Sequence, residues 1–439
     1  MEQVYLTVIF LVTLFFFLGT GIWVALSLLG VALVGMELFT SRPAGDAMIT
    51  TIWTGASSWS LTALPLFIWM GEILFRTRLS EDMFRGLSPW MARLPGRLLH
   101  TNIVGCTIFA AVSGSSAATM TTVGKMAIPE LRRRNYPERL IIGTLAGAGT
   151  LGLMIPPSLT LIVYGVTINE SISKLFIAGI LPGLTLAALF MGYVAFWSFT
   201  NRAEVNALEE EPRRSFREKL MESRYLIPVV LLVVGVLGSI YTGLATATEA
   251  ASFGVVGALV LALVQGSLDW NSFRTSLMGA VKTSCMIAFI LMGASFLSLS
   301  MGFTGLPRAL AAWIADMHLS PHALILALTL FYIVIGCFLD GISSVVLTMA
   351  VVEPMVRGAG IDMIWFGIFI VVVVEMAQIT PPVGFNLFVM QGMTGHQIPY
   401  VARTALPFFL LMVVMVALLV AFPELATFLP DNMRQTPGG

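Results

Sequence analysis

Two pairs of adjacent prolines, Pro156-Pro157 and Pro381-Pro382, are the features of this sequence most suited to ligand chemistry. Each interrupts a long apolar stretch, and the first stretch, residues 140 to 168, carries no charge. Proline removes a backbone donor, so hydrocarbon tolerates such a break only where the freed groups face protein or a polar cavity. Carbonyl oxygens at a break, together with hydroxyl groups, can bind Na⁺, whereas helix N-termini suit anions. We therefore expect ion sites here; the alternative is that each pair only kinks its helix.

A cluster of small polar residues precedes each proline pair and completes a predicted site. The first predicted Na⁺ site combines Ser113, Gly114, Ser115, Ser116, Pro156, Pro157 and Ser158. The second combines Asp340, Gly341, Ser343, Ser344, Thr380, Pro381, Pro382, Val383, Gly384 and Asn386. The organic substrate is expected near Ser116, Ser344 and Asn386. Because the first break reads IPPS and the second TPPV, the two sites need not be chemically equivalent.

Two carboxylates lie inside apolar segments, where a charge is costly and indicates function. Asp340 adjoins the second polar cluster, so it either binds a cation directly or holds the chain at that point. Glu375 precedes the second break. For Glu375 we favour a structural interpretation, in which the buried carboxylate is satisfied by the neighbouring backbone.

Composition indicates the elements that must position these groups. Of 439 residues, 57% are apolar and 11% charged, against roughly a quarter charged in soluble domains. Uncharged runs near the ~20 residues of a spanning helix recur along the chain. An all-α polytopic membrane protein is therefore predicted. The phosphate-binding loop, HExxH, CxxC pair and GxSxG motifs are all missing, so we expect neither an ATPase nor another enzyme.

Basic residues predict which loops face the cytoplasm. Sixteen of the 24 Lys and Arg fall within residues 76 to 97, 125 to 139 and 202 to 224, and the positive-inside rule places all three windows in the cytoplasm. The apolar segment between the first two windows then begins and ends on one side. We interpret it as a re-entrant hairpin with arms of about 12 to 15 residues, roughly 20 Å each. An ordinary helix with small packing residues is the alternative.

An internal repeat relates the two halves of the chain. An offset of 225 residues superposes Pro129 on Pro354, Pro156-Pro157 on Pro381-Pro382, and Pro182 on Pro407. The predicted organisation is given by residue ranges: an N-terminal repeat at 1–200 with a hairpin near 98–130 and a broken helix near 140–168, a charged cytoplasmic linker at 201–224, a C-terminal repeat at 225–425 with a hairpin near 323–356 and a broken helix near 363–391, and a tail at 426–439.

The number of crossings decides the relative orientation of the halves. We count five in the first half, two of them within residues 3 to 38, with Gly19-Thr20-Gly21 as the break. An odd number inverts the second half and places both termini outside. A single tilted helix over residues 3 to 38 would change this parity.

The motifs SGSSAAT, GLMIPPSLTLIVYG, FLDGISSVVLTM and ITPPVGFNLFVMQG resemble those of the large membrane subunit of tripartite ATP-independent periplasmic (TRAP) transporters. The resemblance covers nearly the whole chain. It implies an elevator-type, Na⁺-driven uptake system in the bacterial inner membrane. It also implies two partners, a small four-helix membrane subunit and a periplasmic substrate-binding protein, and an organic-acid substrate such as a C4-dicarboxylate or a sialic acid. Neither an organic cofactor nor a nucleic acid partner is expected.

Two other functions remain open from the sequence. One is a stand-alone Na⁺/dicarboxylate symporter of a related inverted-repeat fold, which would transport without partners. The other is a passive anion channel, which would not depend on Na⁺.

Overall fold

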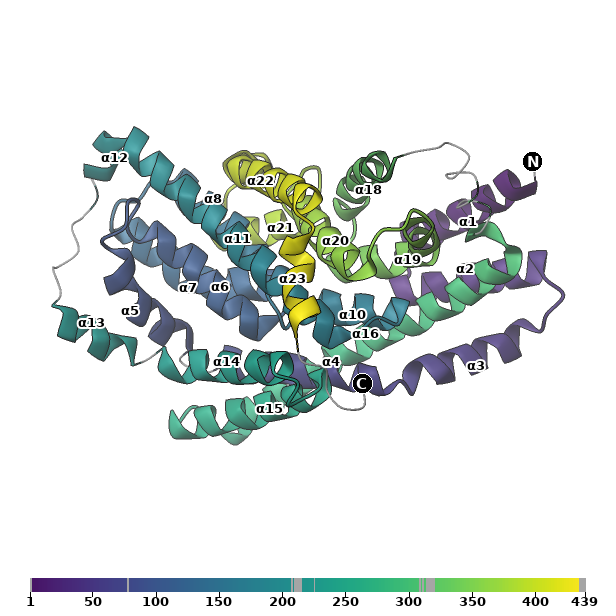
Figure 1. The fold of residues 1–439 in the computed structure, drawn as a ribbon, viewed down its shortest axis with the longest axis horizontal. Helices are drawn as coiled ribbons and strands as arrows, with labels where there is room; N and C mark the ends of the chain where they lie inside the picture. The colour runs from purple at the N-terminus through teal and green to yellow at the C-terminus, as the bar shows by residue number, and fades with distance from the viewer. Residues whose placement is uncertain are drawn as a thin grey trace.

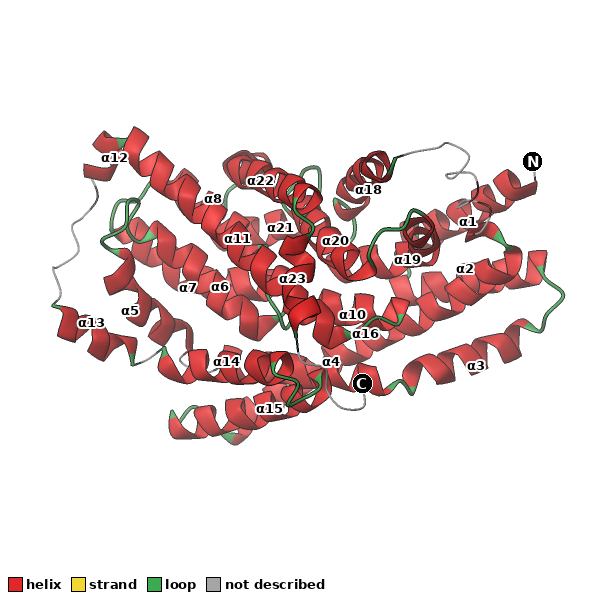
Figure 2. Cartoon of the chain, viewed as in Figure 1, coloured by secondary structure: helices red, strands yellow, loops and turns green. Residues whose placement is uncertain are grey.

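The computed structural model describes residues 2–76, 79–206, 208, 215–224, 226–307, 309, 312 and 320–433. Within these ranges all regular structure is helical, which confirms the all-α prediction (Figures 1 and 2). Six of the described helices are long and apolar enough to cross a bilayer, and two bent helix pairs raise the number to eight.

The first half contains α1 (Glu2–Gly19), α2 (Val24–Phe39), α3 (Ala44–Ala56), the 3-10 helix η1 (Trp59–Thr62), α4 (Ala63–Phe75), α5 (Leu79–Met91), α6 (Leu99–Ser113), α7 (Ser116–Arg133), α8 (Glu138–Gly149), α9 (Leu151–Met154), α10 (Leu159–Ile168) and α11 (Ile172–Thr200). The linker carries α12 (Arg202–Asn206) and α13 (Phe216–Ser223). The second half contains α14 (Ile227–Tyr241), α15 (Ala247–Val264), α16 (Trp270–Thr304), α18 (Pro321–Gly336), α19 (Gly341–Gly358), α20 (Met363–Gln378), α21 (Phe385–Thr394), α22 (Ile398–Ala421) and α23 (Glu424–Asn432).

The offset of 225 residues recurs in the bounds of the helices. Adding it to Ser116–Arg133, the bounds of α7, gives the bounds of α19, Gly341–Gly358. The same offset takes the first residue of α8, Glu138, to Met363, the first residue of α20. It also relates the only two cis peptide bonds found in the described residues, Pro156-Pro157 and Pro381-Pro382. The two halves therefore share an order of helices as well as a proline pattern.

The halves differ in the helix that precedes the hairpin. In the first half α3 and α4 are bent by 55° at Ser57 and Ser58, and the Ser57 hydroxyl donates to the Trp53 carbonyl. In the second half the same stretch is α16, one continuous helix of 35 residues. Figure 1 shows α16 running beside α2, and these two helices are extensively packed together.

The first apolar run forms two helices rather than one. Helix α1 ends at Gly19, Gly21 has a φ of +80°, and α2 begins at Val24. Glycine adopts this left-handed conformation without a steric penalty, so the GTG sequence permits a sharp reversal. This agrees with the count of two helices on which the predicted parity depends.

The second arm of the first hairpin is longer than the predicted 12 to 15 residues, and its counterpart in the second hairpin has the same length. Helices α7 and α19 have 18 residues each, about 27 Å at 1.5 Å per residue. Each helix continues through an internal proline, Pro129 or Pro354, to a basic last turn. By length and hydropathy α19 qualifies as a candidate span. Arm length therefore does not distinguish a re-entrant segment from a spanning one here.

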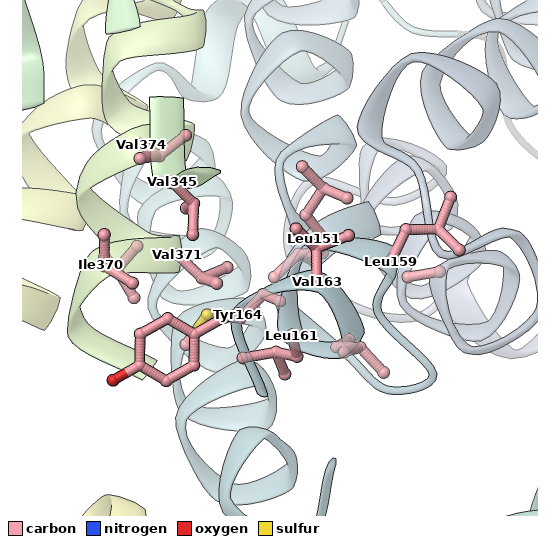
Figure 3. Packing of buried hydrophobic residues seen from close by; sticks show 14 of the residues in the cluster. Leu151, Leu159, Leu161, Val163, Tyr164, Val345, Ile370, Val371 and Val374 are labelled. Carbon is pink, nitrogen blue, oxygen red and sulfur yellow. The ribbon is translucent and has the colours of Figure 1, made fainter. Parts of the chain in front are cut away.

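The two halves meet around α20, which is buried along its whole length. Figure 3 shows Leu151, Leu161 and Tyr164 of the first half facing Ile370 and Val371 of α20. The Tyr164 hydroxyl donates to the Met363 carbonyl at 2.7 Å. Burial of apolar side chains at about 25 cal/mol per Å² makes this contact a stable core between the halves.

The predicted tail, residues 426–439, begins within a short helix. Helix α23 runs from Glu424 to Asn432 and packs against α11 and α20, with Ala426 fully buried. The sequence of this helix, ELATFLPDN, gives little indication of it, because Pro423 precedes the helix and Pro430 lies within its last turn.

Candidate functional site

The turn of the first hairpin is built from the predicted serine cluster. Helix α6 ends at Ser113, Gly114 takes a left-handed φ of +60°, and Ser115 begins α7 as its N-cap. The Ser115 hydroxyl accepts from the Ala118 N–H at 3.5 Å. The Ser113 hydroxyl lies 2.6 Å from the Thr119 hydroxyl and donates to the Ser115 carbonyl at 3.2 Å. These bonds hold two hydroxyl groups and a carbonyl at one tight turn.

The first break lies directly against this turn. The Leu159 N–H, the first of α10, donates to the Gly114 carbonyl at 3.3 Å. A Cβ atom on Gly152 would lie 2.5 Å from the Ser115 carbonyl oxygen, so α9 approaches the turn backbone closely. Pro156, Pro157 and Ser158 are all buried, and Ser158 caps α10 by accepting from the Leu161 N–H at 3.3 Å. The residues of the first predicted site are thus brought together.

In the second hairpin Asp340 occupies the position that Ser115 has in the first. Its carboxylate is the N-cap of α19 and accepts from the N–H groups of Ile342, at 3.1 Å, and Ser343, at 3.3 Å. A carboxylate at a helix N-terminus is also favoured by the helix dipole. Asp340 therefore holds the turn, as one of the two predicted roles requires, and its side chain remains exposed.

The second break is tied to the second hairpin turn by three hydrogen bonds. The Gly384 N–H donates to the Cys337 carbonyl at 3.0 Å, and the Gln378 amide donates to the Leu339 carbonyl at 3.2 Å. The Cys337 thiol donates to the Pro381 carbonyl at 3.5 Å. Gly384 has a φ of +50°, and a Cβ there would lie 2.7 Å from the Thr380 carbonyl oxygen. A side chain at this position would therefore disturb the break.

The two predicted sites differ in exposure. Pro156 and Pro157 are buried, whereas Pro381 and Pro382 are exposed and Val383 is half-buried. The arms of the two hairpins also pack differently, because α6 lies against α7 but α18 lies mainly against α20. A cavity of about 1850 Å³ adjoins the second hairpin, and Asp340, Ser343 and Lys282 contribute polar groups to its mostly apolar wall. The second break therefore lies in the more open part of the molecule.

Two of the three residues predicted to lie near the substrate meet at one side chain. The side chains of Ser116 and Asn386 lie at the same carboxylate, that of Glu375. The Ser344 hydroxyl lies between α18 and α19, 4.0 Å from where a Cβ on Gly336 would stand. Within the described residues, the structure thus joins Ser116 with Asn386 and leaves Ser344 between the arms of its own hairpin.

Sequence reasoning missed two residues at these sites. Thr160 is fully buried beside the second hairpin, 3.6 Å from a Cβ built on Gly341, and its hydroxyl has no hydrogen-bond partner. The interpretation of Glu375 as satisfied by nearby backbone is wrong. Its carboxylate accepts from the Asn386 amide at 3.5 Å, and Oε1 has no partner. The available signal was that Glu375 is the single ionisable residue of α20.

Several buried oxygens at the two breaks are chemically unsatisfied. The side-chain oxygens Thr160 Oγ1, Ser344 Oγ, Glu375 Oε1 and Asn386 Oδ1 lack hydrogen-bond partners. Unpaired buried polar atoms are rare and costly, so each requires an explanation. Small hard cations take oxygen ligands of these kinds, which gives the arrangement a capacity for binding metal ions such as Na⁺.

Comparison with known proteins decides the family. Residues 11–425 match the family described as the tripartite ATP-independent periplasmic transporter, DctM component. This chain belongs to that family. It is therefore a large permease of the TRAP type, a multi-pass membrane protein and not an enzyme.

Individual relatives agree with the family assignment. The chain is 32% identical over 374 residues to the C4-dicarboxylate TRAP transporter large permease protein DctM of Pseudomonas aeruginosa, covering 85% of this chain and 86% of the relative. It is 30% identical over 413 residues to the isethionate TRAP transporter permease protein DctMQ of Oleidesulfovibrio alaskensis, covering 94% of this chain and 64% of that longer protein.

The fold is also similar to that of a solved transporter. The YdaH transporter of Alcanivorax borkumensis has a TM-score of 0.64 to this chain, with 14% identity and with 91% of this chain and 97% of YdaH covered. At this identity the likeness concerns the arrangement of helices alone.

Proposed function

We propose that this permease couples the inward movement of Na⁺ to the uptake of a small organic acid across the bacterial inner membrane. The supporting observation is that each hairpin turn accepts a hydrogen bond from the first N–H groups after a break, Leu159 to Gly114 and Gly384 to Cys337. This arrangement gathers backbone carbonyls and hydroxyls at two related points. One Na⁺ binds at each, in the two clusters predicted from the sequence.

Energetics favour this coupling over passive entry of an anion. A carboxylate that moves toward a negative interior is opposed by about 2.3 kcal/mol per charge per 100 mV. Co-transport of more Na⁺ ions than the substrate has negative charges converts the membrane potential into a driving force. Two sites suffice for a monoanion such as a sialic acid, whereas a C4-dicarboxylate dianion needs a third cation.

The movement we propose is of the elevator type. The hairpins and broken helices, α6 to α10 and α18 to α21, contact one another extensively and would move as one body. Helices α2, α4 and α16 form a second packed group that would act as the scaffold. The packing of α16 against α19 and of α4 against α6 would then be the sliding contacts.

Two partners complete the proposed system, a small four-helix membrane subunit and a periplasmic protein that delivers the substrate. The fused protein DctMQ of Oleidesulfovibrio alaskensis, in which this chain covers 64% of the length, supports a membrane partner for the permease. The apolar exposed faces of α1 and α3 would contact this subunit or lipid.

Reconstitution tests the proposal. The permease and its membrane partner in liposomes, with the binding protein outside, should accumulate organic acid when an inward Na⁺ gradient is present. Replacement of Na⁺ by choline should abolish accumulation, and uptake that persists unchanged would indicate a passive channel. Accumulation by the permease alone would indicate a stand-alone symporter.

A further inference from the structure

Three side chains from three helices meet at the C-terminal end of α20, although the sequence assigned them to different sites or to none. Glu375 lies on α20, Asn386 in the first turn of α21 and Ser116 at the start of α7. The Asn386 amide donates to Glu375 Oε2 at 3.5 Å, and the Ser116 hydroxyl lies against the same carboxylate. Exposure is 1% for Glu375, 0% for Asn386 and 5% for Ser116. The cluster is thus shielded from solvent and joins both halves.

The cluster lacks a positive partner. Glu375 Oε1 and Asn386 Oδ1, both acceptors, have no hydrogen-bond partner. Within the part of the chain that the structure describes, no Lys, Arg or His forms an ion pair with Glu375. An isolated buried carboxylate costs several kcal/mol unless a charge compensates it. Two unsatisfied acceptor oxygens beside one negative charge are the ligand set of a small cation.

We propose that Glu375, Asn386 and Ser116 bind a Na⁺ ion at a third site, separate from the two related clusters. This inference rests on the proposed Na⁺ coupling. One carboxylate balances one monovalent charge, so the occupied site is neutral and can move through a low-dielectric region. A divalent ion would leave an excess positive charge, which the apolar surroundings disfavour. Asn386 and Ser116 are thereby reassigned from the sequence-predicted sites to this one.

The internal repeat provides no second copy of this site. The positions equivalent to Glu375, Asn386 and Ser116 are Thr150, Leu161 and Gly341. Of these, the Thr150 hydroxyl is already used, because it donates to the Gly147 carbonyl at 2.6 Å. The third site therefore makes the number of bound cations odd. With three Na⁺ ions, a dianionic substrate enters together with a net positive charge.

The site also depends on the position of the first hairpin. Ser116 reaches Glu375 only while the start of α7 lies against α20 and α21, and α7 and α21 are in contact in this structure. Binding of Na⁺ would thus stabilise the contact between the first hairpin and the second break.

Direct counting of bound ions tests the inference. The permease purified with its membrane partner is equilibrated by dialysis against saturating ²²Na⁺ at constant ionic strength, and bound ions are counted per chain. Glu375→Gln, which keeps the size of the side chain but removes its charge, should bind one fewer Na⁺ than the wild type. Glu424→Gln is the matched control, because Glu424 is exposed in the first turn of α23. It should bind as many ions as the wild type.

Asn386→Ala provides a second, independent variant if Glu375→Gln fails to elute as a monodisperse protein. Loss of this ligand should lower the affinity for one of the bound Na⁺ ions by at least about tenfold, since even supporting groups of metal sites contribute that much. Equal Na⁺ counts for Glu375→Gln and wild type, or an unchanged Na⁺ titration for Asn386→Ala, would overturn the third site. A wild type that binds no Na⁺ would instead reject the proposed function itself.

Discussion

At the scale of single residues, the repeat preserves roles rather than residue types. Ser115 and Asp340 are equivalent by the offset of 225, and both are N-caps at the start of the second hairpin arm. One cap is neutral and the other is charged, and only the second faces the large cavity. The sequence correctly identified these positions as special because a small polar cluster interrupts an apolar run. It could not separate a cap from an ion ligand, because that depends on where each oxygen points.

Hydroxyl ligands give the first prediction. Ser344→Ala and Ser115→Ala should each raise the Na⁺ concentration for half-maximal uptake several-fold, because one neutral oxygen contributes about 1 kcal/mol. Ser115→Ala should also lower stability by about 1 kcal/mol through loss of its cap. The control is Ser252→Ala on α15, whose exposed hydroxyl only bonds the Thr248 carbonyl. Wild-type Na⁺ dependence in both site variants would remove these residues from the sites.

A close backbone approach gives the second prediction. In Gly152→Ala the new methyl group would lie 2.5 Å from the Ser115 carbonyl oxygen and 2.7 Å from Ser116 Cα, and these backbone atoms cannot move independently of the turn. We expect a loss of about 1–3 kcal/mol in stability and a weaker apparent Na⁺ affinity. Thermal unfolding and Na⁺-dependent uptake measure the two effects.

Gly192→Ala on α11 is the matched control, because a Cβ there meets no atom within 4 Å. It should leave transport unchanged and stability equal or slightly higher. If both glycine variants behaved alike, the contact between α9 and the first hairpin turn would not matter for Na⁺ binding.

Glu375 shows why part of the site could not be read from the sequence. Its position as the lone charge of α20 was visible, yet its partners come from α7, which is more than 200 residues away, and from α21 across the break. Long-range packing brings Ser116 and Asn386 to the carboxylate, and neither apolar periodicity nor proline spacing encodes that contact. The sequence therefore indicated these residues one by one but not that the three meet.

At the scale of elements, the sequence predicted the interrupted helices well and their lengths less well. Proline pairs and glycine-serine clusters disrupt helical hydrogen bonding locally, so the breaks near Pro156 and Pro381 were visible. The far ends of α7 and α19 were not, because each helix continues past a proline to a polar, basic turn.

The cap of α19 allows the two roles of Asp340 to be separated, which is the third prediction. Asparagine is as good an N-cap as aspartate, so Asp340→Asn should change stability by only a few tenths of a kcal/mol. Asp340→Ala removes the acceptor for the Ile342 and Ser343 N–H groups and should cost about 1–2 kcal/mol. Thermal unfolding in Na⁺-free buffer measures this difference.

Na⁺ titration of the same variants then reports on ion binding. If Asp340 binds a cation as well as capping α19, Asp340→Asn should lose Na⁺ affinity while its stability without Na⁺ is retained. A normal Na⁺ titration for Asp340→Asn would restrict Asp340 to its structural role.

At the scale of the whole molecule, the fourth prediction concerns the orientation of the two halves. The predicted five crossings in the first half would place the ends of the first hairpin in the cytoplasm and those of the second outside. Arg93→Cys and Arg133→Cys, before α6 and at the end of α7, should therefore react with an impermeant maleimide only from the cytoplasmic face. Ser320→Cys and Gly358→Cys, which flank α18 and α19, should react only from the periplasmic face. All four positions are exposed.

Labelling of the native cysteines by the maleimide must be controlled in this experiment. Cys285 is exposed and must be replaced by serine, whereas Cys106 and Cys337 are buried and can remain. Because each hairpin contributes no net crossing, both of its ends must react from one face, and the two hairpins must react from opposite faces. Labelling of Arg93→Cys and Arg133→Cys from opposite sides would mean that the first hairpin spans the bilayer. The two halves would then lose the inverted relation that places their breaks at one depth, and with it the physical basis for a shared cation path.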